Sequence, residues 1–223
     1  MKIECVIFDF DGTLFDSMFI WDCAGETYLR SQGRVPQPSL WEDLKPLSLY
    51  QSACYFQREY GLNLSVEKIM AGINKVVEDL YIHQIRPKPG VVEFLERLKK
   101  CGIHMCIATA SERYQVEAAL KRCGMGHFSD AIFTCTEVGR GKDEPVIFRR
   151  AMEHFGADRS NTVVFEDALH AVKTAKADGF RVAAVFDESE QRQEMIRALA
   201  DWYISDFRRI SHEDENSIIH CRK

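Results

Sequence analysis

Short apolar runs recur along the chain and separate longer stretches in which apolar residues return every three to four positions. The runs are nearly continuous in apolar character, which is typical of parallel strands that are covered on both faces. We therefore predict buried strands at residues 3–8, 103–109, 131–135, 162–166 and 181–186, with a further strand near Trp202.

The stretches between the later runs have the periodicity of amphipathic helices. In residues 91–102 the apolar positions share one helical face, and Gly102 is placed to end the helix. Ser111 is placed to cap a second helix that ends near Gly124. Further helices are expected at residues 144–155, 168–177 and 188–200. Because strand and helix alternate, the pattern predicts a doubly wound, Rossmann-like α/β parallel sheet with right-handed crossovers.

One segment interrupts this alternation. Between Asp16 and Arg86 no convincing strand is found, and three amphipathic helical patterns occur instead, at residues 18–29, 47–60 and 66–85. The prolines of "RPKPG" then disfavour continuing the last helix. The sequence thus predicts an α/β core domain built from residues 1–15 and 88–223, with an all-helical cap domain inserted at residues 16–87.

Charge and hydropathy narrow the function classes. The 223 residues include 29 basic and 34 acidic side chains, a net charge of -5, which argues against nucleic-acid or anionic-membrane partners. No apolar run approaches the roughly 18 residues of a membrane span, and the apolar stretch that begins at Cys5 is too short for a signal peptide. The 8 cysteines lack metal-ligand spacing and are expected to be reduced. We therefore expect a cytoplasmic protein, as a monomer or weak homodimer.

Polar side chains follow the successive predicted strands at the points where the strands end. In a parallel sheet these carboxyl ends share one edge, and ligands bind there. The residues delivered to that edge are Asp9 and Asp11, Thr109 and Ser111, Lys142, and Glu166 and Asp167.

These residue types suit a metal and a phosphate. Side chains two apart on a strand point the same way, so Asp9 and Asp11 face one site if the strand continues that far. With Glu166 and Asp167 they would form an oxygen-rich cluster suited to Mg²⁺. Lys142 and the Thr109 hydroxyl would then hold a phosphate.

Taken singly, each feature has an ordinary explanation. An Asp-x-Asp at a strand end is often a polar turn, a loop lysine is usually solvated, and acids beside a helix start favour its dipole. Their joint occurrence at successive strand ends favours a site. No G-x-S-x-G is present to support an α/β-hydrolase serine.

The motifs themselves resemble those of a known family. "DFDGTLFDS", "ATAS", "GKDEP" and "VVFEDALHAVKTAKADGF" are similar to the four motifs of the haloacid dehalogenase superfamily, and the helical insert matches its cap in type and position. Within that superfamily, the β-phosphoglucomutase-like phosphatases are the nearest in pattern. The resemblance therefore implies a phosphatase that acts on a small phosphorylated metabolite, with a mobile cap that closes over it.

The resemblance also assigns roles. Asp9 would be the nucleophile that forms an aspartyl-phosphate, and Asp11 would protonate the leaving group and then activate water. Thr109 and Lys142 would bind the phosphoryl oxygens. The implied phosphate-binding set is Asp9, Gly12, Thr13, Thr109, Ala110, Ser111 and Lys142. The implied Mg²⁺ ligands are the Asp9 carboxylate, the Asp11 backbone carbonyl and Asp167, with Glu166 acting directly or through water.

The chain departs from the mutase pattern. Trp21 stands near a cap histidine of the β-phosphoglucomutases, and Leu49 stands where they have an arginine. Asp143 and Glu144 replace a proline and a small residue of the third motif. Without those cap donors a second phosphate would be poorly held, so simple hydrolysis is favoured. A phosphomutase and a non-catalytic binding protein remain as alternatives. Substrate choice would depend on cap side chains near Trp21, Lys45, Tyr50 and Lys75.

Overall fold

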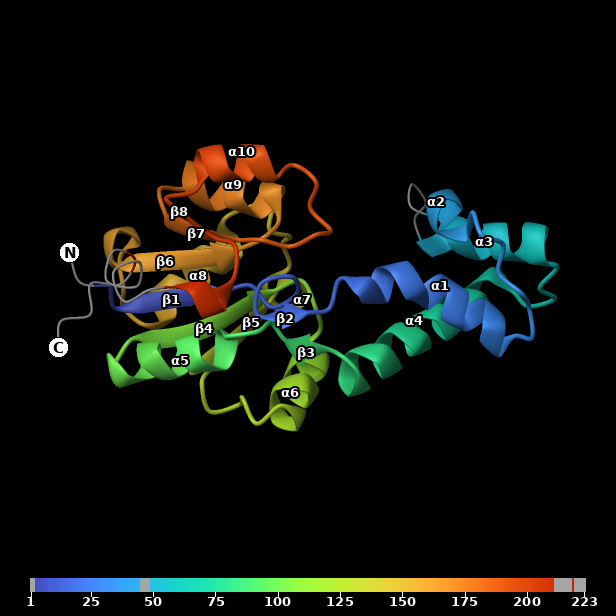
Figure 1. Ribbon diagram of the computed structural model, residues 1–223, viewed down its shortest axis with the longest axis horizontal. Helices are drawn as coiled ribbons and strands as arrows, with labels where there is room; N and C mark the ends of the chain where they lie inside the picture. Colours follow the sequence, from blue (N-terminus) through green and yellow to red (C-terminus); the bar gives the residue numbers. More distant parts are fainter. Residues whose placement is uncertain (1–2, 45–48, 211–217, 219–223) are drawn as a thin grey trace. The chain divides into compact units, whose positions relative to one another are not determined.

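The computed structural model describes residues 3–44, 49–210 and 218, without the side chains at 21, 22, 41 and 42. A six-stranded parallel sheet forms the core of its α/β unit (Figure 1). The strand order is β5-β4-β1-β6-β7-β8. The strands are β1 (Cys5–Phe8), β4 (His104–Thr109), β5 (Ala131–Thr134), β6 (Thr162–Glu166), β7 (Arg181–Val185) and β8 (Trp202–Ile204). The order reverses on either side of β1, so the predicted doubly wound sheet is confirmed, with its switch point at β1.

Alternate residues of each strand face opposite layers of the core, as the period of a strand requires. On one face, Cys5 and Ile7 belong to a buried cluster with Phe148 of α8 (Val146–His154) and Val172 of α9 (Leu169–Ala177). On the other face, Phe8 packs edge-on against Phe94 of α5 (Val91–Lys100), with ring centroids 6.4 Å apart. Both faces are therefore covered, which explains why the strands read as continuous apolar runs.

The helices that follow the strands lie close to their predicted places. They are α5 (Val91–Lys100), α6 (Arg113–Arg122), α7 (Cys135–Val138), α8 (Val146–His154), α9 (Leu169–Ala177) and α10 (Gln193–Leu199), with 3-10 turns at Arg159–Asn161 and Phe207–Arg209. The sequence did not predict α7. The N-cap of α6 is Glu112, not Ser111, because the Ser111 hydroxyl donates to Asp11 instead.

Residues 17–85 form a second compact unit of four helices: α1 (Phe19–Ser31), α2 (Leu40–Leu44), α3 (Leu49–Tyr60) and α4 (Val66–His83). Its interior contains Phe56, whose ring lies 6.1 Å from that of Tyr28 and 6.0 Å from that of Tyr60. The short α2 was not predicted. Lys45, one of the proposed specificity positions, lies outside the described residues, as does the side chain of Trp21.

The first unit comprises residues 1–16 and 86–223, so the chain passes between the units after Asp16 and before Arg86. At these crossings the two strands β2 (Phe15–Asp16) and β3 (Arg86–Pro87) pair antiparallel. The expectation of no strand up to Arg86 is therefore wrong at both ends. Two-residue strands carry no periodicity that a sequence could reveal, and Pro87 is tolerated because the ribbon is all edge.

The structure tests two expectations from the sequence: that the cysteines are reduced and that no segment spans a membrane. Cys101 forms a disulfide, which corrects the expectation of a fully reduced set, whereas Cys5, Cys106 and Cys135 are free. Sequence spacing cannot reveal such a pairing because it depends on tertiary distance. Among the described helices, none combines the length and apolar character that crossing a membrane requires.

Candidate active site

The acidic loop begins where β1 ends. The strand stops at Phe8, and the backbone N–H of Asp9 still donates to the Phe165 carbonyl of β6, at 2.9 Å. The chain then turns tightly, because the N–H groups of Leu14 and Phe15 both donate to the Phe10 carbonyl. The turn leaves Asp9 buried at the sheet edge, with only 6% of the residue exposed.

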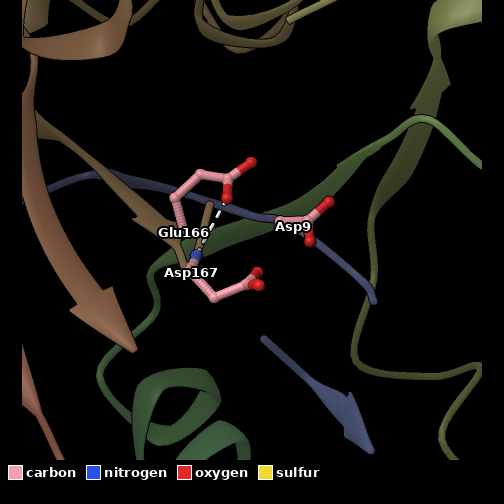
Figure 2. Close-up of side chains that lie close together, drawn as sticks. All are labelled: Asp9, Glu166 and Asp167. Carbon is pink, nitrogen blue, oxygen red and sulfur yellow. Dashed lines mark hydrogen bonds between the residues drawn. The ribbon is translucent and has the colours of Figure 1, made fainter. Parts of the chain in front are cut away.

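A second pair of acids lies at the end of the neighbouring strand β6. Glu166 is its last residue, and one of its carboxylate oxygens accepts the N–H groups of Asp167 and Ala168, at 2.8 and 3.0 Å. Asp167 accepts the Thr13 hydroxyl at 2.8 Å, which joins the two acidic segments across the sheet. Figure 2 shows Asp9, Glu166 and Asp167 with their carboxylates close together.

Lys142 completes this buried group. Its ammonium group donates to Asp9 and, at 2.6 Å, to Glu166. The lysine lies on the loop between α7 and α8 and is 7% exposed, so it is not the solvated loop lysine that the sequence alone allowed. Asp9, Glu166 and Asp167 each offer an oxygen within 4.8 Å of the others. The site thus holds three acids against one lysine.

Burial shapes the electrostatics of the cluster. It raises the pKa of Asp9 from 3.8 to about 7, opposed by Lys142 and reinforced by Glu166 and Asp11. Burial also raises the pKa of Asp167 well above its ordinary value, with Glu166 and Asp9 adding to the effect. Burial alone would lower the pKa of Lys142, but the Asp9 and Glu166 carboxylates outweigh it and keep the lysine charged. The raised pKa values of Asp9 and Asp167 therefore show that one lysine does not fully compensate the three carboxyl groups, so their joint ionisation is disfavoured.

A divalent cation fits this donor set. Closely spaced carboxylate oxygens are the ligands of hard cations such as Mg²⁺, and a cation would relieve the like-charge repulsion that burial strengthens. Gly12 leaves space for the Asp167 carboxylate in this cluster. Its φ is +78°, and a Cβ at this position would lie 2.8 Å from the Cγ of Asp167.

Asp11 has surroundings different from those of Asp9. Its carboxylate accepts the Ser111 hydroxyl at 2.5 Å, and it is not part of the described carboxylate group that Asp9 joins. The premise that the strand continues through Asp11 is wrong, because the turn at Phe10 ends the two-residue alternation. The two aspartates therefore have different hydrogen-bond partners: Lys142 for Asp9 and Ser111 for Asp11.

The remaining predicted residues lie around this edge. Thr109 ends β4 fully buried, and its hydroxyl oxygen accepts the N–H of Ser111 at 3.0 Å. Ala110 lies between them in the chain. The Thr13 hydroxyl is directed at Asp167, so any contact of Thr13 with a phosphate would come from its backbone.

Asp187 was not predicted from the sequence. It lies two residues after the end of β7, and its carboxylate accepts the backbone N–H of Ser189. Its carboxylate is buried and forms an ion pair with Lys88 at 2.8 Å. Its position just after a predicted parallel strand could have identified it, because β7 ends at the same edge of the sheet as the other strands.

Comparison with known proteins agrees with this geometry. A model of the family "haloacid dehalogenase-like hydrolase" matches residues 6–185. The phosphorylated carbohydrates phosphatase of Thermotoga maritima is 24% identical over 79% of this chain and 82% of its own length. Hexitol phosphatase A of Escherichia coli is 28% identical over 83% of this chain and 84% of its own.

Solved structures share the fold. A crystal structure of a Thermotoga maritima protein assigned as a β-phosphoglucomutase superposes with a TM-score of 0.84, at 22% identity, covering 99% of this chain and 100% of that one. The family match runs from within β1 to the end of β7 and includes the segments that carry Asp9, Lys142 and Asp167. The chain belongs to the haloacid dehalogenase-like hydrolases.

Proposed function

We propose that this protein is a Mg²⁺-dependent phosphatase that hydrolyses a small phosphorylated metabolite through an aspartyl-phosphate on Asp9. The observation that supports it most is the buried group of Asp9, Glu166 and Asp167 around Lys142 at the carboxyl ends of the strands. Its curated relatives include phosphatases of phosphorylated carbohydrates and of a hexitol, as their names state.

In the first step a carboxylate oxygen of Asp9 attacks the phosphorus, and the bond from phosphorus to the ester oxygen breaks. Asp11, as the acid, gives its proton to the departing alkoxide. The ammonium of Lys142 and the hydroxyl of Thr109 hold the phosphoryl oxygens in place while the group is transferred. Lys142 already contacts Asp9, so nucleophile and phosphate binder are positioned together.

In the second step water attacks the phosphorus of the aspartyl-phosphate. Asp11, now a carboxylate, takes the proton of that water, and the bond between phosphorus and the Asp9 oxygen breaks to release inorganic phosphate. The Ser111 hydroxyl, 2.5 Å from Asp11, holds the carboxylate in position for both transfers. Ser111 is thus assigned to orient Asp11, in addition to any contact that it makes with the phosphate.

Asp9, Asp167 and the Asp11 backbone carbonyl would hold the Mg²⁺ ion, with Glu166 acting directly or through water. When bound, the ion supplies positive charge that offsets the repulsion between a carboxylate nucleophile and a phosphate dianion. Thr13 contributes by holding Asp167 at 2.8 Å. The helical unit of residues 17–85 is assigned the choice of substrate.

The test is phosphate release from p-nitrophenyl phosphate and from a panel of phosphorylated metabolites, with Mg²⁺ and with EDTA. Asp9→Asn is expected to stay folded and to lose several orders of magnitude in turnover, on the scale known for removing a nucleophile. EDTA is expected to abolish activity reversibly. Near-normal hydrolysis by Asp9→Asn at matched Mg²⁺ would refute the assignment. Isomerisation of a sugar phosphate faster than phosphate release would favour a mutase.

A further inference from the structure

The partly buried Lys88 and the buried Asp187 form an ion pair that the proposed chemistry does not use. Their charged atoms lie 2.8 Å apart, and the side chains are 14% and 7% exposed. The same ammonium donates to the Phe186 carbonyl at 2.6 Å, across 98 residues of sequence. Asp187 is also satisfied on its second oxygen, which accepts the N–H and the hydroxyl of Ser189. Two or more hydrogen bonds per partner make this a fixed contact and not a mobile surface pair.

Lys88 lies where the chain returns from the helical unit to the core. Lys88 directly follows β3, the return crossing from the helical unit. Its backbone N–H donates to the Leu14 carbonyl at 2.9 Å and so extends the pairing of β2 with β3. Lys88 therefore contacts two segments at once. Its backbone binds Leu14, just before β2, and its side chain binds Phe186 and Asp187, just after β7.

Leu14 belongs to the acidic loop itself. Its N–H donates to the Phe10 carbonyl, Gly12 donates to the Phe15 carbonyl, and the rings of Phe10 and Phe15 stack at 4.4 Å. The loop from Asp9 to Phe15 is thus one tight turn whose far end is fixed by Lys88. A displacement at Leu14 is expected to reach Asp9 and Asp11, because hydrogen bonds join Leu14 and Phe15 to the Phe10 carbonyl between the two aspartates.

We propose that Lys88, held by Asp187, is a positioning residue for the loop that carries Asp9 and Asp11. This inference rests on the proposed function for its kinetic consequence but not for its structural one. A nucleophile must be held within a fraction of an ångström of its attack geometry, and small displacements cost about 10- to 100-fold in rate. The pair does not touch the reacting atoms and acts on the loop through Leu14 and β2, while the Asp187 carboxylate also adds to the raised pKa of Asp167.

The variants are chosen to separate positioning from stability. Lys88→Met removes the charge and keeps the apolar stem, but it takes the cation away from Asp187. Lys88→Met/Asp187→Leu removes both charges and is expected to recover stability. Lys88→Arg keeps the charge and is expected to rescue. The matched control is Lys176→Met, which removes an ion pair of similar length, 2.7 Å from Asp201, elsewhere in the core unit.

The first measurement is amide hydrogen exchange of the metal-free protein, which needs no activity. Residues 10–15 and 86–90 are expected to exchange at least about 10-fold faster in Lys88→Met and in the double variant than in the wild type, the Lys88→Arg variant or the Lys176→Met control. The second measurement is hydrolysis of p-nitrophenyl phosphate, where kcat per folded molecule is expected to fall about 10- to 100-fold with KM changed less.

The outcomes separate the two proposals. Wild-type exchange in residues 10–15 of the double variant would overturn the positioning role, and so would a wild-type kcat in a double variant of normal melting temperature. If the wild-type protein hydrolyses no phosphate ester, the proposed function fails, and the exchange measurement alone decides whether Lys88 fixes the loop.

Discussion

At Gly12 the acidic loop has both an unusual backbone conformation and a close neighbour. Its φ is +78°, and a Cβ would lie 2.8 Å from the Cγ of Asp167. Gly12→Ala is therefore expected to cost about 1 kcal/mol in free energy of unfolding from the backbone. It should also displace Asp167 and weaken Mn²⁺ or Mg²⁺ binding at least about 10-fold, as measured by calorimetric titration.

The control for Gly12 is Gly102, which has a φ of +69° but no described atom within 4 Å of the place where a Cβ would lie. Gly102→Ala should lose a similar amount of stability and keep its cation affinity. Equal cation affinity in the two alanine variants would show that the approach of Gly12 to Asp167 does not matter for the cation site.

The raised pKa of Asp9 predicts how the metal-free protein responds to pH. Burial raises that pKa from 3.8 to about 7, so between these values the folded state binds more protons at Asp9 than the unfolded state does. The contribution of Asp9 to stability must then fall as the pH rises from about 4 to 7. Asp9→Asn removes this titration.

The measurement is the difference in free energy of unfolding between Asp9→Asn and the wild type, from urea titrations in EDTA. That difference should shift in favour of the variant with rising pH across this window and level off above about 7. Saturating Mg²⁺ should reduce the shift, because bound cation favours the charged carboxylate. A pH-independent difference would contradict the raised pKa.

Helix α9 begins at Leu169, just after Asp167, and its start is stabilised from a distant loop. Its N-cap, Ala168, offers no side-chain acceptor, and the N–H of Leu169 donates instead to Glu190, 3.2 Å away. Arg192 holds Glu190 with bonds of 2.8 and 2.7 Å. Glu190→Gln should therefore cost about 1 kcal/mol, and adding Ala168→Ser, a local cap, should recover most of it.

The contact between Glu190 and Arg192 also makes the stability of the protein depend on pH. Hydrogen bonds from Arg192 lower the pKa of Glu190 from 4.5 to about 2, against the effect of burial. An acid with a lowered folded pKa contributes stability that is complete above its ordinary value and is lost as the pH falls toward the folded one. Urea titrations should show a weaker loss of stability between pH 4.5 and about 2 in Glu190→Gln than in the wild type. Parallel pH profiles would contradict this role.

Elements with a full period were predictable from the sequence, and contacts between distant loops were not. The central strands and long helices follow from apolar spacing alone. Asp9 and Asp167 follow from their places just after strands, whereas Lys142 lies beyond α7 on the loop before α8, so strand ends alone do not locate it. The two-residue strands β2 and β3 were not predictable, because they have no period. The partners Lys88 and Asp187, and the capping of α9 by Glu190, depend on tertiary proximity that spacing does not encode.

At the scale of the whole molecule, the chain contains two compact units joined by two adjacent crossings. Residues 17–85 are inserted between Asp16 and Arg86, and these two residues are register partners in the β2–β3 ribbon. The ends left by removing the insert are thus already side by side. A two-residue Asn-Gly turn is the usual connection for such a pair of antiparallel strands, so replacing residues 17–85 with Asn-Gly should close the core without strain.

The shortened protein is expected to fold, since its sheet, both covering layers and the group of Asp9, Lys142, Glu166 and Asp167 all belong to the first unit. It should unfold cooperatively by circular dichroism and bind Mn²⁺ within about 3-fold of the full chain by calorimetric titration. If the helical unit selects the substrate, differences in kcat/KM among phosphate esters should shrink by at least about 10-fold, while p-nitrophenyl phosphate is still cleaved. A cooperative, cation-binding core with undiminished selectivity would place specificity in the core, because selection would then need no residue from 17–85.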